Sequence, residues 1–298
     1  MSQPRLSVVV PSVNGISDLS DCLDALATQR SDCQLEVLVV DRCGTAVRDE
    51  VRRRFPWVRV LEANPGTTIP ELRARAFAEA RGDFVAVIED HVMVSSGWAR
   101  QLLDAAREAE QVVGGSVENA ATERVVDWAA FLCEYSHCIL PLPAGKADWL
   151  TGNNVIYPRA LLARYTELLR AGGWENQLHD ALRRDGVRLE CRPEIRVGHK
   201  KHYTVGEYLS QRYLYARSYA GARVAGAPVA RRLAYGAAAF ALPPLLFYRT
   251  VSRVFLKRRH RAELVQSLPL LALFVTSWAL GEVVGYWAGP GDSLARVC

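Results

Sequence analysis

The amino-acid sequence predicts an α/β fold with a mostly parallel sheet and flanking helices, followed by hydrophobic C-terminal helices. Within the first 120 residues, short β-branched segments alternate with segments of helical periodicity. The predicted strands are almost continuously apolar, which is typical of parallel strands covered by helices on both faces. The last part of the chain differs, because it contains two long stretches without a charged residue.

Strands and helices alternate in the first part of the chain. The strands are predicted at residues 6–10, 35–40, 58–61, 83–89 and 111–117. The helices between them are predicted at residues 18–29, 45–54, 70–80 and 97–109. In the first helix, the residues with the spacing of one helical face are Leu19, Cys22, Leu23 and Leu26. In such sheets, ligands bind outside the carboxyl ends of the strands, so the residues that follow each strand are candidates for a binding site.

The middle of the chain predicts a mixed region. Residues 148–162 run from a Gly-Asn-Asn turn into a short strand and the start of a helix. Residues 172–190 predict a loop, a helix from about 175 to 185, a C-cap at Gly186 and another strand. Glu175 falls near the N-terminus of that helix, where a negative charge is favoured.

The composition indicates a folded protein of one large or two small domains. The chain has 298 residues, of which half are hydrophobic and 23% are charged. The net charge is +5 and no nucleic-acid-binding motif accompanies it, so an anionic membrane surface is a better partner than nucleic acid. The N-terminus has no charged segment followed by a long apolar core, which predicts no signal peptide and a first domain in the cytoplasm.

The seven cysteines predict reduced, mostly buried thiols. No two of them form a Cys-x-x-Cys pair. The closest group is Cys133, His137 and Cys138, which lacks the second ligand pair of a structural zinc site.

The C-terminal part predicts membrane-associated helices over residues 221–298. Residues 233–248 carry no charge but contain two prolines, whereas the uncharged stretch 264–281 is long enough to span a bilayer. Six Lys and Arg residues lie between them, at 249–261, and Trp and Tyr residues lie near the ends. Two core helices of a soluble protein are the alternative. Because the basic segment should stay on the inner side, we expect 233–248 to be re-entrant or interfacial and only 264–288 to span.

Polar residues follow three of the predicted strands. They are Pro-Ser-Val-Asn-Gly at 11–15, Asp41, and Glu89-Asp90-His91. Since the carboxyl ends of parallel strands meet at one edge, these residues predict a pocket for a polar, phosphorylated ligand. Carboxylates alone would repel phosphates, and a divalent cation between them removes this conflict. The sequence therefore predicts a metal-assisted nucleotide site.

Three segments, LSVVVPSVNG, LEVLVVDRCGT and LRARAFAEARGDFVAVIEDH, together resemble the motifs of family 2 glycosyltransferases with the GT-A fold. The resemblance covers roughly residues 5–220. It implies that the nucleotide sugar is bound by Pro11, Ser12, Asn14, Asp41, Arg73, Glu89 and Asp90. Within these three segments the chain departs from the family, because it lacks the aromatic residue before Asn14, has Arg42 where a second Asp is usual, and has Ala74 where an Asn is usual.

In this family resemblance, Glu89-Asp90-His91 occupies the place of the Asp-x-Asp motif, which binds a divalent cation that bridges the diphosphate. The resemblance implies Mn²⁺ or Mg²⁺ as cofactor, with Asp90 and His91 at the metal. An imidazole suits Mn²⁺ better than Mg²⁺, which prefers oxygen ligands. Alternatively Asp90 supplies the oxygen and His91 only packs beside it.

The acceptor side is implied by two further segments. TGNNVIYPRALL resembles the acceptor loop of the family, and it places Gly152, Asn153 and Asn154 on that side. WENQLHDALRRDG resembles the segment that carries the general base, which falls on Glu175, with Trp174 where a preceding acid is usual. His179 and Asp180 are lesser candidates for the base.

Together these features predict an inverting, metal-dependent glycosyltransferase that moves a sugar from a nucleotide sugar to an acceptor hydroxyl, with a lipid-linked or cell-envelope glycan as the expected acceptor. The expected parts are a nucleotide-binding half at 1–120, an acceptor half at 121–220, and membrane helices at 221–298. The catalytic domain is expected at the cytoplasmic face of the inner membrane.

The segment from Gln211 to Tyr215 is a poor copy of the motif of processive polymer synthases. Residues 213–223 resemble an amphipathic interfacial helix.

Two alternatives remain open at this point. A nucleotidyltransferase has a related sheet, but it usually carries a glycine-rich run with Arg after the first strand, which this chain lacks. A non-catalytic, membrane-anchored scaffold would explain the departures at Arg42, Ala74 and Trp174.

Overall fold

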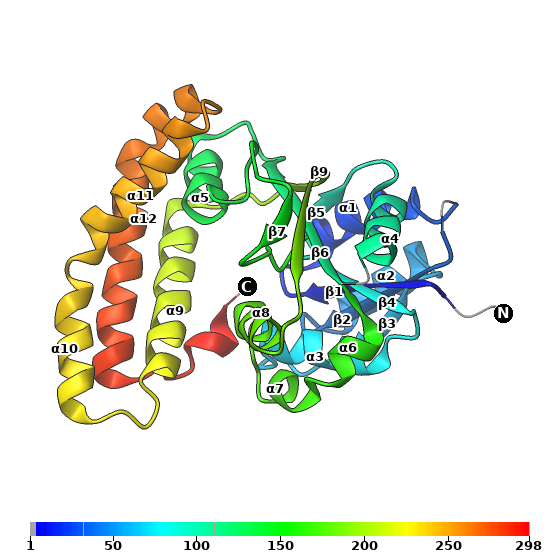
Figure 1. The fold of residues 1–298 in the computed structure, drawn as a ribbon, viewed down its shortest axis with the longest axis horizontal. Coiled ribbons are helices and arrows are strands. Elements are labelled where there is room, and N and C mark those ends of the chain that lie inside the picture. The colour runs from blue at the N-terminus through cyan, green and yellow to red at the C-terminus, as the bar shows by residue number, and fades with distance from the viewer. Residues whose placement is uncertain (1–3, 32, 110, 298) are drawn as a thin grey trace. The chain divides into compact units, whose positions relative to one another are not determined.

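The computed structural model describes residues 4–31, 33–109 and 111–297, and the chain divides into two compact units (Figure 1). The first unit comprises Met1–Ala120 and Cys138–Lys200. The second comprises Ala121–His137 and Lys201–Cys298. Segments from two parts of the sequence thus build each unit.

The first unit contains a nine-stranded sheet. Its strands are β1 (Leu6–Ser12), β2 (Leu35–Asp41), β3 (Arg59–Glu62), β4 (Phe84–Val87), β5 (Val92–Val94), β6 (Val112–Asn119), β7 (Gly145–Ala147), β8 (Val155–Pro158) and β9 (Leu189–His199). Their order is β3-β2-β1-β4-β8-β6-β9-β5, and β7 pairs with β9. The five strands predicted within the first 120 residues are present, although the one predicted at 83–89 already ends at Val87.

The sheet is mixed, and less parallel than the sequence predicts. β1 pairs in parallel with β2 and β4, β2 with β3, and β6 with β9. The pairs of β8 with β4 and β6, and of β9 with β5 and β7, are antiparallel. Apolar periodicity reports burial of a strand but not its direction, so the antiparallel strands of the second half could not be told apart from parallel ones.

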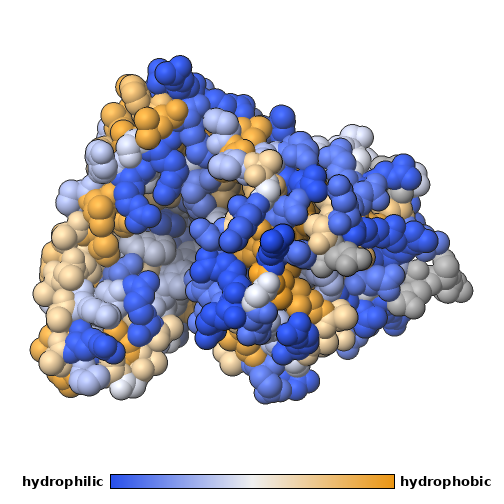
Figure 2. All heavy atoms as spheres, in the orientation of Figure 1, coloured by the Kyte–Doolittle hydropathy of each residue, from blue (hydrophilic) through white to orange (hydrophobic). Residues whose placement is uncertain are grey.

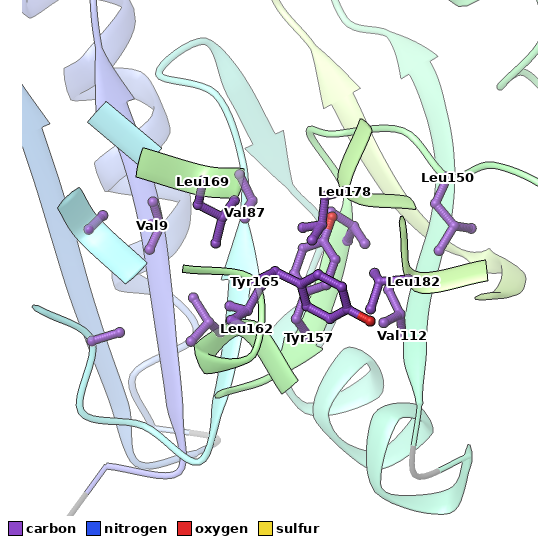
Figure 3. Close-up of a cluster of buried hydrophobic side chains, with 14 of the residues drawn as sticks. Val9, Val87, Val112, Leu150, Tyr157, Leu162, Tyr165, Leu169, Leu178 and Leu182 are labelled. Atoms are coloured by element: carbon purple, nitrogen blue, oxygen red, sulfur yellow. The ribbon is translucent and has the colours of Figure 1, made fainter. Parts of the chain in front are cut away.

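Seven helices of the first unit are described. They are α1 (Ile16–Ala27), α2 (Thr45–Arg54), α3 (Ile69–Glu79), α4 (Trp98–Ala109), α6 (Arg159–Ala163), α7 (Thr166–Arg170) and α8 (Glu175–Arg184). Leu178 and Leu182, one turn apart on α8, pack with Tyr157 of β8 and Leu162 of α6 in a buried cluster (Figure 3). Alternate side chains of the central strands, such as Val9, complete this cluster. The cluster fixes α8, and therefore its first residue, against the sheet.

The second unit is helical in its described part. It contains α5 (Val125–Tyr135), α9 (Val205–Arg223), α10 (Val229–Ala239), α11 (Leu242–Leu256), α12 (Arg261–Ala288) and the short 3₁₀ helix η1 (Ser293–Arg296). Helix α12 is central, because it contacts α5, α9, α10 and α11 (Figure 1).

The six described cysteines of the whole chain carry free thiols, and Cys298 lies outside the described residues.

Helices α9 and α12 approach each other closely through two glycines. A Cβ on Gly281 would lie 2.3 Å from the backbone oxygen of Tyr213, and one on Gly285 would lie 2.5 Å from that of Arg217. Glu282, between them in sequence, is buried and accepts a hydrogen bond of 2.8 Å from the Trp278 indole. These contacts hold one side of α12 against α9.

Within the described residues, α12 is the one helix long and apolar enough to cross a membrane, and half of its apolar window is buried inside the protein. The uncharged stretch 233–248 does not form one helix. It is divided between α10 and α11, with a break at Phe240 and Ala241. The sequence-based expectation of a span at 264–288 and an interfacial 233–248 stays a prediction.

Candidate active site at the carboxyl ends of the strands

Asp41, the last residue of β2, is buried and fully hydrogen-bonded. Its Oδ1 accepts hydrogen bonds from the Ser12 hydroxyl (2.8 Å) and the Cys43 backbone N–H (3.2 Å). Its Oδ2 accepts from the Gly44 N–H (3.1 Å) and from the Arg48 guanidinium (3.2 Å). The carboxylate thus fixes the turn after β2, and the structure brings together two of the predicted nucleotide-binding residues, Ser12 and Asp41.

Asp90 lies in a tight turn between β4 and β5 and binds the loop that follows β1. Its Oδ2 accepts hydrogen bonds from the backbone N–H groups of Val13 (2.8 Å) and Asn14 (2.9 Å). Its Oδ1 accepts from the Asn14 side-chain amide at 2.7 Å and lies 3.0 Å from His91 Nδ1. Asp90 is fully buried. Its role in this structure is to hold the Asn14 loop and the His91 ring.

Three possible metal ligands meet beside this turn. Glu89, His91 and His199 each offer one ligand atom, and these atoms lie within 4.8 Å of one another. The Nε2 atoms of the two histidines are 3.0 Å apart, and Glu89 Oε2 lies 3.4 Å from His91 Nε2. His199 is the last residue of β9 and pairs with Val92 across the antiparallel β5–β9 ladder, which places it next to His91.

The charges of this cluster stabilise one another. Burial opposes the charge on His91, but hydrogen bonds to Asp90 and Glu89 outweigh it and raise the pKa of His91 to about 10. Burial also opposes ionisation of the two carboxyls, yet the neighbouring His91 lowers the pKa of Glu89 and of Asp90. The cluster therefore holds two carboxylates around one cation, which in the metal-free protein is the protonated imidazole.

The donor set fits a divalent cation. Two imidazole nitrogens and one carboxylate oxygen suit Mn²⁺ and related transition metals better than Mg²⁺. The hydrogen bond from His91 Nδ1 to Asp90 leaves Nε2 directed at Glu89 and His199, and such a carboxylate behind a histidine is the usual way to orient a ligating ring. Of the two sequence-predicted metal residues, His91 therefore belongs to this cluster, and Asp90 lies behind it.

Arg73 connects the cluster to the predicted base. It lies on α3, whose N-terminus is capped by Thr68, and its side chain is almost fully buried. Its Nη2 lies 3.5 Å from Glu89 Oε1, and its Nη1 lies 2.5 Å from Glu175 Oε2. Glu175 is the first residue of α8 and is partly exposed. The structure thus brings two residues that are 102 positions apart in sequence, Arg73 and Glu175, to the same edge as Glu89.

Gly152 provides the space for the Glu175 side chain. A Cβ at Gly152 would lie 2.3 Å from Glu175 Oε1. Next to it, Asn153 donates a hydrogen bond of 3.3 Å to Glu89 Oε2, so the predicted acceptor loop reaches the candidate metal site. The loop therefore contacts both predicted functional acids.

The Asn154 side chain has a structural role. Its Nδ2 donates to the carbonyl oxygens of Ser116 (3.0 Å) and Ile195 (2.9 Å), and its Oδ1 accepts from the Trp98 indole (3.0 Å). This amide thus links β6, β9 and α4.

The lesser base candidates lie elsewhere on α8, where His179 is buried against the Tyr157 hydroxyl (2.8 Å) and Asp180 is exposed. Burial lowers the pKa of His179 to about 3, so it is neutral.

His199 and Arg48 were missed by sequence reasoning as residues of this edge. His199 lies 108 positions after His91, and no sequence motif connects the two residues. The strand predicted after Gly186 was the one local signal, because His199 is the last residue of that strand, β9. Arg48 lies on α2 and reaches Asp41, a contact that follows from the strand–turn–helix geometry and not from any motif.

The first half of the chain matches a known protein family. The sequence model of glycosyl transferase family 2 matches residues 7–159, slightly more than half of the chain. This range includes β1 to β8 and, within it, Asp41, Arg73, Glu89 and His91. No curated protein matches the chain.

Comparison with solved structures supports the same fold. The crystal structure of S. aureus TarS 1–349 in complex with UDP aligns with 92% of this chain and 91% of its own chain, at 17% identity and a TM-score of 0.50. A longer S. aureus TarS structure aligns at 18% identity and a TM-score of 0.49 over 71% of this chain, which spans 39% of that chain. The predicted GT-A type of α/β fold is thereby confirmed.

Proposed function

The chain belongs to glycosyl transferase family 2, and on this premise we propose that it transfers a sugar from a nucleotide-sugar donor to an acceptor hydroxyl, with inversion. The observation that carries the proposal is the meeting of Glu89, His91 and His199 within 4.8 Å at the carboxyl edge of the sheet. Glycosyl transfer from a nucleotide sugar creates a diphosphate leaving group, and this edge offers a place for the cation that such a group needs.

Glu89, His91 and His199 would hold a divalent cation, with Mn²⁺ favoured over Mg²⁺ by the two imidazoles. A bound ion would supply Lewis-acid stabilisation of the charge that develops on the diphosphate. Asp90 keeps the His91 ring in the orientation required for ligation. The loop after β1, held by Asp90, and the turn after β2, held by Asp41, would form the walls of the nucleotide site.

Glu175 would act as the general base that removes the proton from the acceptor hydroxyl. Its Oε2 is held by Arg73 at 2.5 Å, whereas Oε1 faces Gly152 and, among the described residues, accepts no hydrogen bond. This leaves one oxygen to receive the proton. Arg73 therefore serves to position the base, in addition to the nucleotide-binding role that the family motif implies.

The donor and acceptor are proposed as classes. UDP is named in the complex of the TarS structure and is the first nucleoside diphosphate to test. A lipid-linked or cell-envelope glycan is the proposed acceptor, and association with the inner membrane, with the first unit on the cytoplasmic side, is the proposed location. The apolar helix α12 and the basic segment 249–261 support an association with a membrane.

The test combines binding and turnover. Purified protein is heated with UDP, with and without Mn²⁺ or Mg²⁺, and its melting temperature is recorded. UDP should raise the melting temperature only in the presence of the ion, and a screen of nucleotide sugars should then give metal-dependent hydrolysis of one of them. Absence of stabilisation by any nucleoside diphosphate with either ion would favour the scaffold alternative instead.

A further inference from the structure

Helix α11 carries an outward-facing apolar stripe. Leu245, Tyr248, Phe255 and Leu256 recur with helical spacing and are all exposed, Tyr248 at 70% and Leu256 at 77%. The opposite side of the helix is buried through Val254. In the space-filling view, hydrophobic residues gather along the edge that α10 and α11 form (Figure 2). A monomeric soluble protein rarely exposes so many large apolar side chains together, so this stripe is expected to be covered.

The stripe is surrounded by positive charge. Arg249 lies on the same face of α11, and Arg258 and Arg259 follow directly after the helix, all three exposed. The sequence contains no Asp or Glu between Glu207 and Glu263. The surface that covers the stripe must therefore combine apolar groups with negative charge.

A second copy of the chain does not meet this requirement. In a two-fold symmetric dimer the same patch would face itself, so the positive charges of Arg249 and Arg258 in both copies would come together and repel each other. A bilayer with anionic headgroups offers phosphates at its surface and hydrocarbon beneath, which matches the arrangement of arginines around an apolar stripe.

The dimensions favour a helix that lies along the bilayer. Helix α11 has 15 residues, or about 22 Å at the rise of an α-helix, which is short of the roughly 30 Å of a hydrocarbon core. Helix α12 is long enough, but its contacts with α9 at Gly281 and Gly285 and the ion pair of its buried Glu282 with Arg223 (3.5 Å) are made inside the unit. An α12 that crossed the bilayer alone would have to give up these contacts.

We infer that the protein binds the surface of an anionic bilayer through α11, with the apolar stripe in the outer hydrocarbon layer and the arginines at the lipid phosphates, and without a membrane span. The inference concerns a surface of the second unit and does not depend on the proposed sugar transfer. It replaces the predicted span at 264–288 by a helix that packs on one side against α9.

Vesicle flotation with the full-length protein tests this surface. We expect the protein to float with vesicles of equal parts phosphatidylcholine and phosphatidylglycerol, and to stay at the bottom with phosphatidylcholine alone. High salt should weaken the binding, because the arginine–phosphate attraction is screened. Alkaline carbonate should release the protein from the vesicles or from native membranes. Retention in the membrane after carbonate treatment would overturn the inference in favour of a span.

Matched variants locate the surface. The triple variant Arg249→Glu, Arg258→Glu, Arg259→Glu should lose flotation, whereas Arg100→Glu, Arg107→Glu, Arg188→Glu, an equal change of charge at exposed positions of the first unit, should keep it. Tyr248→Glu with Leu256→Glu should also lose flotation, and Tyr248→Ser with Leu256→Ser is the milder pair if the first does not fold. Equal flotation of the α11 variants and the control would refute the inference.

Two further measurements distinguish membrane binding by α11 from a defect of the first unit and from self-association. The melting temperature with UDP and Mn²⁺ reports ligand binding by the first unit. If the protein does not bind vesicles but UDP still raises its melting temperature, the result contradicts the proposed role of α11 and leaves the proposed enzyme function untouched. Light scattering reports self-association. A wild-type dimer that becomes monomeric on Leu256→Glu, together with no binding to vesicles, would mean that a second copy covers the stripe, and the inference would be wrong.

Discussion

The Nε2 atoms of His91 and His199 lie 3.0 Å apart, although the two residues are 108 positions apart in sequence. Two imidazole nitrogens at this distance share a proton or a cation, because two lone pairs would repel each other. Glu89 adds a carboxylate on the same side. The three residues therefore form a candidate ion site.

Asp90→Asn should weaken metal binding. The variant removes the carboxylate that accepts a hydrogen bond from His91 Nδ1. Loss of a hydrogen-bond partner that orients a ligating histidine typically lowers metal affinity by about 10- to 100-fold. Mn²⁺ affinity is measured by titration calorimetry. Asp41→Asn is the matched control, because Asp41 is an equally buried strand-end carboxylate that does not touch His91. The control should lower the melting temperature but keep the Mn²⁺ affinity, and equal affinity losses in both variants would indicate general unfolding.

Metal affinity should increase with pH. The pKa of His91 is raised to about 10, so below that pH the metal-free imidazole is protonated and each bound ion must displace one proton. The apparent affinity is then expected to rise about tenfold per pH unit until the pH reaches about 10. Calorimetry in buffers of different ionisation enthalpy counts the released protons. An affinity without pH dependence would mean that His91 is not a ligand.

Glu175→Gln should abolish transfer while leaving donor binding intact. The amide keeps the shape of the side chain but cannot take a proton, and loss of a general base typically costs about 10²- to 10⁴-fold in rate. Turnover is measured on the donor found in the hydrolysis screen, and donor binding by thermal shift. Asp180→Asn, on an exposed acid of the same helix, is the control and should stay active. Normal turnover of Glu175→Gln would remove Glu175 from this role.

Gly152→Ala should reduce turnover by displacing the base. The new Cβ would fall 2.3 Å from Glu175 Oε1, so the carboxylate must move, and a misplacement of about 1 Å can cost on the order of 10²-fold in rate. Gly66→Ala is the matched control, because nothing lies within 4 Å of a Cβ there. Both variants should fold, and equal turnover of Gly152→Ala and Gly66→Ala would contradict the close contact with Glu175.

The sequence allowed the strand ends to be predicted well, because apolar strands followed by polar residues are local signals. Asp41, Glu89 and His91 lie at one edge, as expected from the parallel pairing of β1 with β2 and β4. His199 could not be predicted as their neighbour, since its position depends on antiparallel pairing of β9 with β5, a long-range choice that periodicity does not encode.

The separate roles of Glu89 and Asp90 could not be predicted from the motif either. Glu89 and Asp90 are adjacent in sequence, yet Glu89 faces His199 and Asp90 faces the backbone of the Asn14 loop, because the tight turn after β4 sends their side chains in different directions.

The environment of α10 and α11 could not be predicted from the sequence either. Pro243 and Pro244 mark an interruption in the uncharged stretch, but tertiary packing decides whether the pieces lie in a membrane or on a protein core.

We expect the two-sided position of Asp90 to couple the proposed binding of the ion to that of the donor. Its Oδ1 contacts His91 and its Oδ2 contacts the N–H groups of Val13 and Asn14, so a ligand at either place alters the charge felt at the other. Thermodynamic linkage requires the effect to be mutual, and the factor by which the ion tightens nucleotide binding must equal the factor by which the nucleotide tightens ion binding. Paired titrations should return that single factor, and a cell with little free manganese would then load the ion mainly when the nucleotide sugar is abundant.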